Sequence, residues 1–305
     1  MLGATSLVGS RFVSHSAHRV AAAGRTDPEV RGLKVERFDR VDLLHPELLS
    51  RLVESIPEPV VVNFAARTDV DGVELERGEH LAPEGPAWTV NALVPAAVSR
   101  AVRNSGKRFV QISTDFVFDG REGPYDESAP RSTLSAGLNW YGWTKGEGER
   151  LALDENGDLA IVRIAYPYGL DKGPKLDLAR WILEKHRANV LPPLYGNQQI
   201  TPTWIPDVTQ AVDELVRRPL RGVFHAASPE ITTPLEFGRV LLGRMEGEAP
   251  AVAEGELTLP VPGSRVAPRP IHGGLVSRRA DELGVRLTSW REGIELLVSE
   301  VQRSR

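Results

Sequence analysis

Short apolar runs rich in β-branched residues alternate with longer helical patterns along most of this 305-residue chain. The runs that predict strands are His18–Ala23, Val60–Phe64, Arg108–Ser113, Leu159–Ile164 and Gly222–Ala226. Most of their residues are apolar, which is typical of strands that helices cover on both faces. Strands that alternate with helices in this way form parallel pairs joined by crossovers. The chain is therefore predicted to be an α/β protein with a doubly wound parallel sheet.

Helical periodicity occupies the intervals between these runs. After about Gly169, proline and glycine become frequent and the strand patterns shorten. Helices are predicted over Glu47–Glu54, Ala92–Asn104 and Tyr141–Leu153. Farther on, Gly173–Pro206 predicts a helix followed by irregular chain, Glu246–Gly274 an irregular stretch, and Ser289–Val301 a last helix. We expect a first domain over residues 1–168, to which a strand near 222–227 returns, and a smaller lobe over residues 169–305.

Composition excludes several classes of protein and site. The chain has no cysteine, which rules out disulfides, thiolate metal sites and a cysteine nucleophile. His15 and His18 have no third ligand at a matching spacing, so no metal site is predicted. No stretch has the roughly 20 apolar residues of a membrane span, and no secretory signal opens the chain. The formal charge of −4, without basic runs, indicates no nucleic-acid partner. We expect a cytoplasmic protein, with a homodimer as one option.

A glycine-rich turn opens the chain, and a helix-compatible stretch follows it. A turn of this kind directs backbone N–H groups and the positive end of a helix at a pyrophosphate. Ser6 stands where a complete dinucleotide fingerprint has glycine, so an ordinary turn is the alternative. The residues predicted to bind a dinucleotide are Gly3, Thr5, Ser6, Leu7, Val8 and Gly9.

Only Met1 and Leu2 precede this turn, although a Rossmann-type sheet needs a strand that leads into it. Without that strand its two neighbours would lose ladder partners, and buried unpaired backbone groups are costly. We therefore expect the natural gene product to begin several residues earlier, with a short apolar strand ahead of Gly3. A sheet whose centre is built differently is the alternative.

Arg25 closely follows the predicted strand His18–Ala23. In dinucleotide enzymes an acidic residue at this point binds the ribose 2′-hydroxyl, whereas an arginine accommodates a 2′-phosphate. Arg25 therefore favours NADP(H), and a solvated loop arginine is the alternative. Asp42 and Leu43, later in the same half, are candidates for the edge of the adenine pocket.

Tyr141 and Lys145 are four residues apart, so they share one face of a predicted helix. A nearby cation favours phenolate, and we therefore expect Lys145 to lower the pKa of Tyr141. A phenol tuned in this way is a competent proton donor to a carbonyl oxygen. The spacing alone is common, but Thr114 ends the strand upstream and brings a hydroxyl that could complete the set.

Further motifs occur in a fixed order over nearly the whole chain. They are Val61–Asp71, Ile112–Gly120, Tyr141–Glu147, Val162–Arg163 with Tyr168–Gly169, Thr201–Thr203 with Pro206–Asp207, and Arg269–Pro270 followed by Leu283–Gly284 and Trp290–Gly293. In this order they resemble the extended short-chain dehydrogenases/reductases, and within them the dTDP-4-dehydrorhamnose reductase family and its sugar-nucleotide-binding relatives. The string Ser-Thr-Asp-x-Val-Phe-x-Gly, from Ser113 to Gly120, is quite specific to this branch.

The resemblance implies roles for the matching residues. Thr114 would orient the substrate carbonyl, Tyr141 would be the acid, and Lys145 would bind the cofactor ribose and tune the tyrosine. Asn63, Ala65 and Ala66 would line the path of the cofactor, and Asn91 would support the site. The residues expected to contact substrate are Thr68, Val70, Asp115, Phe116, Thr201 and Thr203.

The activity that the resemblance implies is NADPH-dependent reduction of a keto group on a nucleotide-activated sugar. NAD(H) remains an option for the cofactor. One alternative is an NAD-dependent sugar-nucleotide epimerase or dehydratase, and another is a non-catalytic, cofactor-binding regulatory subunit. Phe116 replaces the tyrosine usual in the reductases, and a longer insertion lies between Glu74 and Asn91. These departures leave the identity of the sugar open. The first domain would bind the dinucleotide and the smaller lobe the substrate.

Overall fold

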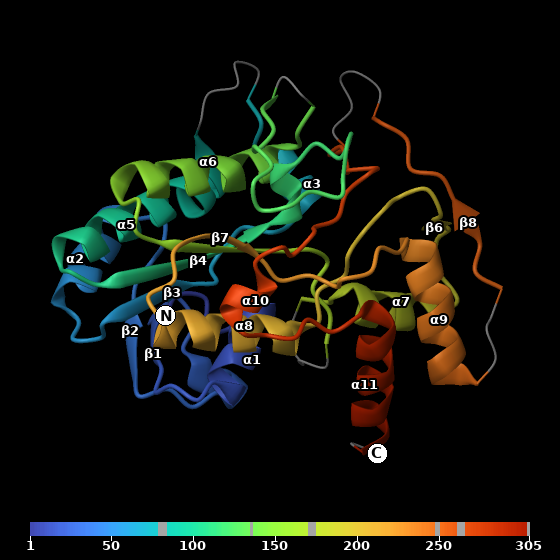
Figure 1. Ribbon diagram of the computed structural model, residues 1–305, viewed down its shortest axis with the longest axis horizontal. Coiled ribbons are helices and arrows are strands. Elements are labelled where there is room, and N and C mark those ends of the chain that lie inside the picture. Colours follow the sequence, from blue (N-terminus) through green and yellow to red (C-terminus); the bar gives the residue numbers. More distant parts are fainter. Residues whose placement is uncertain (79–83, 135–136, 170–174, 248–250, 261–265, 304–305) are drawn as a thin grey trace.

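The computed structural model describes residues 1–78, 84–134, 137–169, 175–247, 251–260 and 266–303. Its centre is a parallel sheet with helices on both faces, as predicted (Figure 1). The strands are β1 (Ala21–Gly24), β2 (Arg37–Arg40), β3 (Val60–Asn63), β4 (Arg108–Thr114), β5 (Ala160–Ile164) and β7 (Gly222–His225). Strands β3, β4, β5 and β7 lie side by side in that order, and β1 pairs with β2.

Leu2 joins the two parts of the sheet. Its backbone forms parallel bridges to Ala23 of β1 and to Asn63 of β3, with the Leu2 N–H 2.9 Å from the Val62 carbonyl oxygen. Next to Met1, a cavity of about 210 Å³ lies between β1 and β3 and reaches Leu49 and Val53 beneath it. Leu2 thus occupies the position of the first strand. The expectation of a longer strand ahead of Gly3 stays a prediction.

Two helical layers cover the sheet. On one face lie α2 (Pro46–Ser55), α5 (Val94–Asn104) and α6 (Trp140–Glu155), and on the other lie α1 (Leu7–His15), α8 (Ile205–Arg217) and the short α10 (Ala280–Leu283) (Figure 1). Leu49 and Val98 pack with Phe109 in the first layer, whereas Phe12 and Val212 pack with Val162 in the second. The sheet is buried on both sides, which explains its apolar strands.

A second lobe follows β5. It contains α7 (Leu178–Arg187), α9 (Pro234–Glu246), α11 (Trp290–Arg303) and the short pair β6 (Leu194–Tyr195) and β8 (Glu254–Gly255) (Figure 1). Its core gathers around buried aromatic side chains: Tyr168, Trp204, Phe237 and Trp290. The helices predicted near both ends of this region are confirmed as α7 and α11.

The first part of the chain also contains short elements: η1 (Pro28–Arg31), α3 (Val70–Glu74), α4 (Gly85–Trp88), η2 (Thr89–Leu93) and η3 (Asp115–Val117).

The differences from the predicted elements have physical causes. Strand β1 begins at Ala21 rather than His18, because the His18 backbone N–H binds the Ser16 hydroxyl and its ring contacts the Asp213 carbonyl of α8. The prediction omitted β2, whose sequence Arg-Phe-Asp-Arg carries little apolar signal at the sheet edge. It also omitted α8 and α9.

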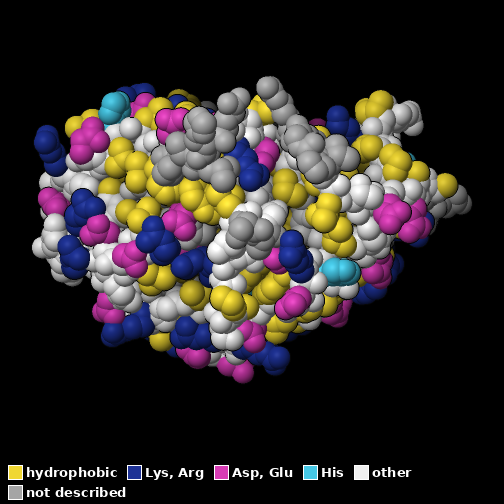
Figure 2. Space-filling model, turned by 90° about the horizontal axis from the view of Figure 1, so that it is seen from above, with side chains coloured by type: hydrophobic (Ala, Val, Ile, Leu, Met, Phe, Trp, Pro, Cys, Tyr) yellow, Lys and Arg dark blue, Asp and Glu magenta, His cyan; other side chains and the backbone are white. Residues whose placement is uncertain are grey.

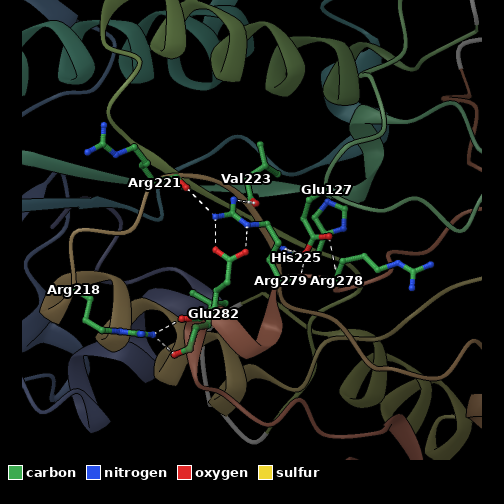
Figure 3. A network of polar contacts seen from close by, with 9 residues as sticks. Glu127, Arg218, Arg221, Val223, His225, Arg278, Arg279 and Glu282 are labelled. Carbon is green, nitrogen blue, oxygen red and sulfur yellow. Dashed lines mark hydrogen bonds and ion pairs between the residues drawn. The ribbon is translucent and has the colours of Figure 1, made fainter.

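The segment before α10 covers the outer strand β7. Glu127 accepts hydrogen bonds from the backbone N–H groups of His225, Arg278 and Arg279, while the Arg279 guanidinium donates to the Val223 carbonyl and pairs with Glu282 (Figure 3). The same guanidinium lies 4.0 Å from the centre of the Phe224 ring. An exposed edge strand invites unwanted pairing, so this network protects β7.

A buried ion pair attaches α6 to the sheet. Arg163 of β5 donates to both carboxylate oxygens of Glu149, over 3.0 and 2.7 Å, and both residues are at most 2% exposed. Arg131 adds a third cationic contact at 3.4 Å. The arginines hold the pKa of Glu149 below its usual value, although burial opposes them.

None of the helices in the described ranges is long and apolar enough to span a membrane.

We predict that Glu149→Gln lowers the free energy of unfolding by about 3–5 kcal/mol, because it leaves the Arg163 charge buried without a counter-charge. Denaturant titration followed by circular dichroism measures the change. Glu147→Gln is the matched control on the same helix, since Glu147 pairs with Arg150 near the surface and should contribute less than about 1 kcal/mol. Equal effects of the two substitutions would contradict the structural role of the buried pair.

Candidate active site

The glycine-rich turn leads directly into α1, as expected. The Ser6 hydroxyl accepts the Gly9 N–H at 3.1 Å and so caps the helix, which makes serine a suitable residue at this point. Gly3 has φ +74°, and an added Cβ would lie 2.6 Å from the Ala65 nitrogen. The backbone there can hold no larger residue. The turn therefore presents the N-terminus of α1 next to the loop after β3, a cradle that fits a pyrophosphate.

Arginines surround the adjoining end of β1. Arg25 is exposed directly after the strand, and its carbonyl accepts a hydrogen bond from Arg40 at 2.9 Å. Arg31 of η1, which the sequence analysis missed, donates to the Thr5 carbonyl at 2.7 Å. Its position on a short 3-10 helix gave no motif to recognise. Asp42 and Leu43 follow β2, where the Asp42 carboxylate accepts the Leu44 N–H.

The loop after β3 is fixed by two buried amides. The Asn63 side chain accepts the Ala65 N–H and donates to Gln111, each over 2.9 Å, so it shapes the path of Ala65 and Ala66 from inside the core. Asn91 clamps the backbone of Arg67 with both ends of its amide and also donates to the Thr144 hydroxyl of α6. Asn91 thereby couples this loop to the helix that carries Tyr141.

Thr114, Tyr141 and Lys145 lie together at the carboxyl end of β4. Thr114 is the last residue of that strand, and its hydroxyl shares a hydrogen bond with the phenol of Tyr141. Lys145 stands one helical turn beyond Tyr141, and its ammonium donates to the Ile112 carbonyl at 2.8 Å. All three side chains are buried. The geometry unites the set predicted from the Tyr–Lys spacing.

Capping groups fix the start of α6 and hence the position of Tyr141. The Asn139 side chain accepts the Gly142 N–H at 2.7 Å, and a Glu74 oxygen accepts the Trp140 N–H at 2.6 Å. Farther along, a Cβ on Gly148 would lie 2.0 Å from the Asn91 carbonyl oxygen. Only glycine permits this close contact between α6 and η2.

The expectation that Lys145 lowers the pKa of Tyr141 is wrong for the chain without ligand. Burial raises the pKa of Tyr141, and only its hydrogen bond with Thr114 lowers it, while the Asp115 carboxylate raises it further. The Lys145 ammonium instead binds the Ile112 carbonyl, and burial lowers the pKa of Lys145 to about 8. Burial likewise raises the pKa of Asp115 to about 7. Desolvation, which helical spacing does not reveal, dominates here.

The residues expected to contact substrate fall into two groups. Val70 and Phe116 pack around Tyr141, Asp115 accepts from the Thr114 hydroxyl, and Thr68 lies in the loop after β3. By contrast, Thr201 and Thr203 are each 1% exposed, and their hydroxyls bind backbone groups of Leu275, Ala165 and Ala226. The Thr203 hydroxyl both accepts and donates in these bonds, whereas the Thr201 hydroxyl accepts, and a contact of either with substrate stays a prediction.

Tyr166, which packs with Phe116 and Tyr141, and its partner Gln198 were not predicted from the sequence. Tyr166 follows β5 at the same sheet edge, has the rare positive φ of 43°, and lies 6.1 Å from Phe116 between ring centres. The Gln198 amide donates to its phenol oxygen at 2.8 Å. Strained backbone of this kind gathers at functional sites. Its place after a predicted strand was the available signal.

In the described ranges, no three or more His, Asp or Glu side chains are grouped to hold a metal ion. Part of the insertion after Glu74, residues 79–83, lies outside those ranges, and α4 follows it.

Comparison with known proteins places the chain. The family model described as the RmlD substrate binding domain matches residues 1–303. The chain belongs to this family. It is 30% identical over 290 residues to a probable low-salt glycan biosynthesis reductase of Haloferax volcanii, covering 92% of this chain and 91% of that protein. It is also 30% identical over 290 residues to the dTDP-4-dehydrorhamnose reductase of Mycobacterium tuberculosis, covering 91% and 87%.

Solved structures confirm the fold of this RmlD family member. The crystal structure of dTDP-4-dehydrorhamnose reductase from Bacillus anthracis in complex with NADP superposes with a TM-score of 0.76. It is 22% identical in sequence and covers 98% of this chain and 96% of the solved one.

We predict that the Lys145 ammonium titrates near pH 8 in the ligand-free chain, well below an exposed lysine, because burial disfavours its charge. NMR of the chain labelled at lysine Cε measures this, and the spectrum of Lys145→Met assigns the signal. The exposed Lys34 serves as the internal control. A Lys145 signal that titrates above pH 10 would contradict the effect of burial.

Proposed function

We propose that this RmlD family member reduces a keto group of a nucleotide-activated sugar with NADPH. The observation that carries the proposal is the meeting of Thr114, Tyr141 and Lys145 beside the phosphate cradle of α1. A complete set of catalytic side chains favours reduction over a purely regulatory role. The names of the relatives, which include a dTDP-4-dehydrorhamnose reductase, support the same activity.

Residues 1–168 would hold the dinucleotide. The turn from Gly3 to Gly9 would receive its pyrophosphate, Ala65 and Ala66 would border its path, and Asp42 and Leu43 its adenine. Arg25 would bind the 2′-phosphate and so favour NADPH over NADH. Arg31, which donates to the Thr5 carbonyl, would be a second cation near that phosphate. When bound, the nicotinamide supplies the hydride, and Lys145 would hold the adjoining ribose.

Residues 169–305 would close over the sugar nucleotide. In the proposed mechanism the phenol of Tyr141 gives its proton to the carbonyl oxygen of the substrate. Its raised pKa keeps it protonated in the resting chain, so the acid is present before substrate arrives. The Thr114 hydroxyl orients that oxygen, and a Lys145 ammonium released from the Ile112 carbonyl would stabilise the negative charge that Tyr141 acquires. Positioning by the caps of α6 contributes to the rate.

We also propose that the protein works in the cytoplasm as a homodimer. Apolar side chains gather over the helical layer that contains α5 and α6 (Figure 2). Leu93, next to α5, is 37% exposed, and Trp143 of α6 is half-buried there. An exposed apolar patch on a helical face is suited to a second copy of the chain.

We predict that Tyr141→Phe lowers kcat by ~10²–10⁴-fold, since general acid catalysis contributes about that much. NADPH affinity should stay nearly unchanged, because the phenyl ring keeps its packing. Loss of NADPH absorbance with a panel of nucleotide-linked keto-sugars measures turnover, and fluorescence measures cofactor binding. Tyr195→Phe, on the short strand β6 of the lobe, is the control. A Tyr141→Phe chain that kept half of the parent turnover would exclude this acid.

Cofactor choice gives a separate prediction. The chain should bind NADPH more tightly than NADH, and Arg25→Ala should erase most of the difference, because a hydrogen bond to a charged group is worth roughly 1.5–3 kcal/mol. Calorimetric titration with both cofactors measures it, with the exposed Arg51→Ala as control. Equal affinities in the parent chain would reject this role for Arg25.

A further inference from the structure

Lys175 reaches across from the second lobe to the loop after β3. Its ammonium donates to the Thr68 carbonyl at 2.9 Å and to the Thr68 hydroxyl. Thr68 stands at the carboxyl edge of the sheet, and it precedes Asp69, the residue that caps α3. The contact therefore lies where the second lobe meets this edge of the sheet, and this junction is called the mouth. Lys175 is an exposed residue, although desolvation of its ammonium by these contacts lowers its pKa, an effect that Asp69 opposes.

The cations beside Lys175 are already neutralised by carboxylates. Arg269 binds both oxygens of Asp71, at 3.0 and 2.8 Å, and Arg67 binds Glu76 at 2.9 Å. In the described part of the chain, Lys175 differs from them because its hydrogen-bond partners are two neutral oxygens, both on Thr68. The nearby Asp69 carboxylate accepts the Gly72 N–H through one oxygen and acts on the Lys175 charge, but the two side chains form no ion pair.

Lys145 is another ammonium at this edge that binds a neutral oxygen, the Ile112 carbonyl, but unlike the exposed Lys175 it is buried. The proposed function uses Lys145 for the cofactor ribose and for Tyr141. Lys175 then remains as a cation at the mouth without an ionic hydrogen-bond partner. An ammonium gains more from an anionic oxygen than from a neutral one, because hydrogen bonds between charged groups are roughly twice as strong.

We propose that Lys175 binds the diphosphate of the nucleotide-activated sugar and exchanges its contacts with Thr68 for phosphate oxygens. The proposal rests on the proposed function, because it names the group of that substrate which the second lobe recognises. Release of Thr68 would return its hydroxyl and carbonyl to the mouth, where the sugar enters. Lys175 would thus link recognition of the nucleotide part to the surface that meets the sugar.

Binding measurements without turnover test this assignment. Calorimetry compares thymidine diphosphate and uridine diphosphate with thymidine and uridine, on the full chain in the presence of NADPH. We expect Lys175→Gln to weaken diphosphate binding by about 10- to 100-fold, the loss of a charge-assisted contact, and to leave nucleoside and NADPH binding unchanged. Lys175→Arg should retain most of the affinity. Lys185→Gln, later on α7, is the matched control with no expected effect.

A purely structural contact with Thr68 would move the melting temperature but not the difference between diphosphate and nucleoside. Equal diphosphate affinity in the parent chain and in Lys175→Gln would overturn the proposal, and so would a parent chain that binds neither diphosphate. The proposed function fails separately, when no nucleotide-linked keto-sugar is reduced although the diphosphates bind through Lys175.

Discussion

The attachment of α6 to the sheet is the constraint on which the site depends. Glu149 and Arg163 join the helix to β5, while Asn139 and Glu74 hold its first turn. These anchors hold the backbone of α6, and with it Tyr141 and Lys145, in one place relative to Thr114 at the end of β4. A buried ion pair contributes little net stability when compared with apolar packing, but its directional bonds specify one placement of the helix. The arrangement of the proposed catalytic groups is therefore a property of the fold rather than of a flexible loop.

Burial sets the charge states at this site. The environment of Tyr141 keeps it protonated, and that of Lys145 brings its pKa to about 8, close to neutral pH. Asp115, with a raised pKa of about 7, is poised in the same range. A bound dinucleotide would exclude more water and add its own charges. Because burial sets the pKa of each group, a ligand that displaced more water would shift these values without any movement of the backbone.

The predictable part of this protein was encoded locally. Apolar runs identified five of the strands, and the interval between Tyr141 and Lys145 identified one helix face, because both depend on neighbouring residues. Long-range contacts decided the rest. The hydroxyls of Thr201 and Thr203 bind backbone groups more than 20 residues away, as the bonds to Ala226 and Leu275 show. The contact of Lys175 with Thr68 joins residues 107 positions apart, and no motif marks it. Strand β2 was not predicted because its sequence is polar. Its backbone hydrogen bonds to β1, which form between distant residues, make it a strand.

The role of Leu2 has a consequence for how the molecule opens. In the described ranges, the backbone bonds that join β1 to β3 pass through Met1 and Leu2, and Leu49 and Val53 of α2 pack against this part of the sheet. Leu2 thereby couples any local opening of the β1–β2 unit to β3, since parts of a fold can open with free energies of their own. A dinucleotide that contacts both units across this junction would hold them together. Part of its binding free energy would then oppose separation of the two units, because a ligand stabilises the arrangement that it binds.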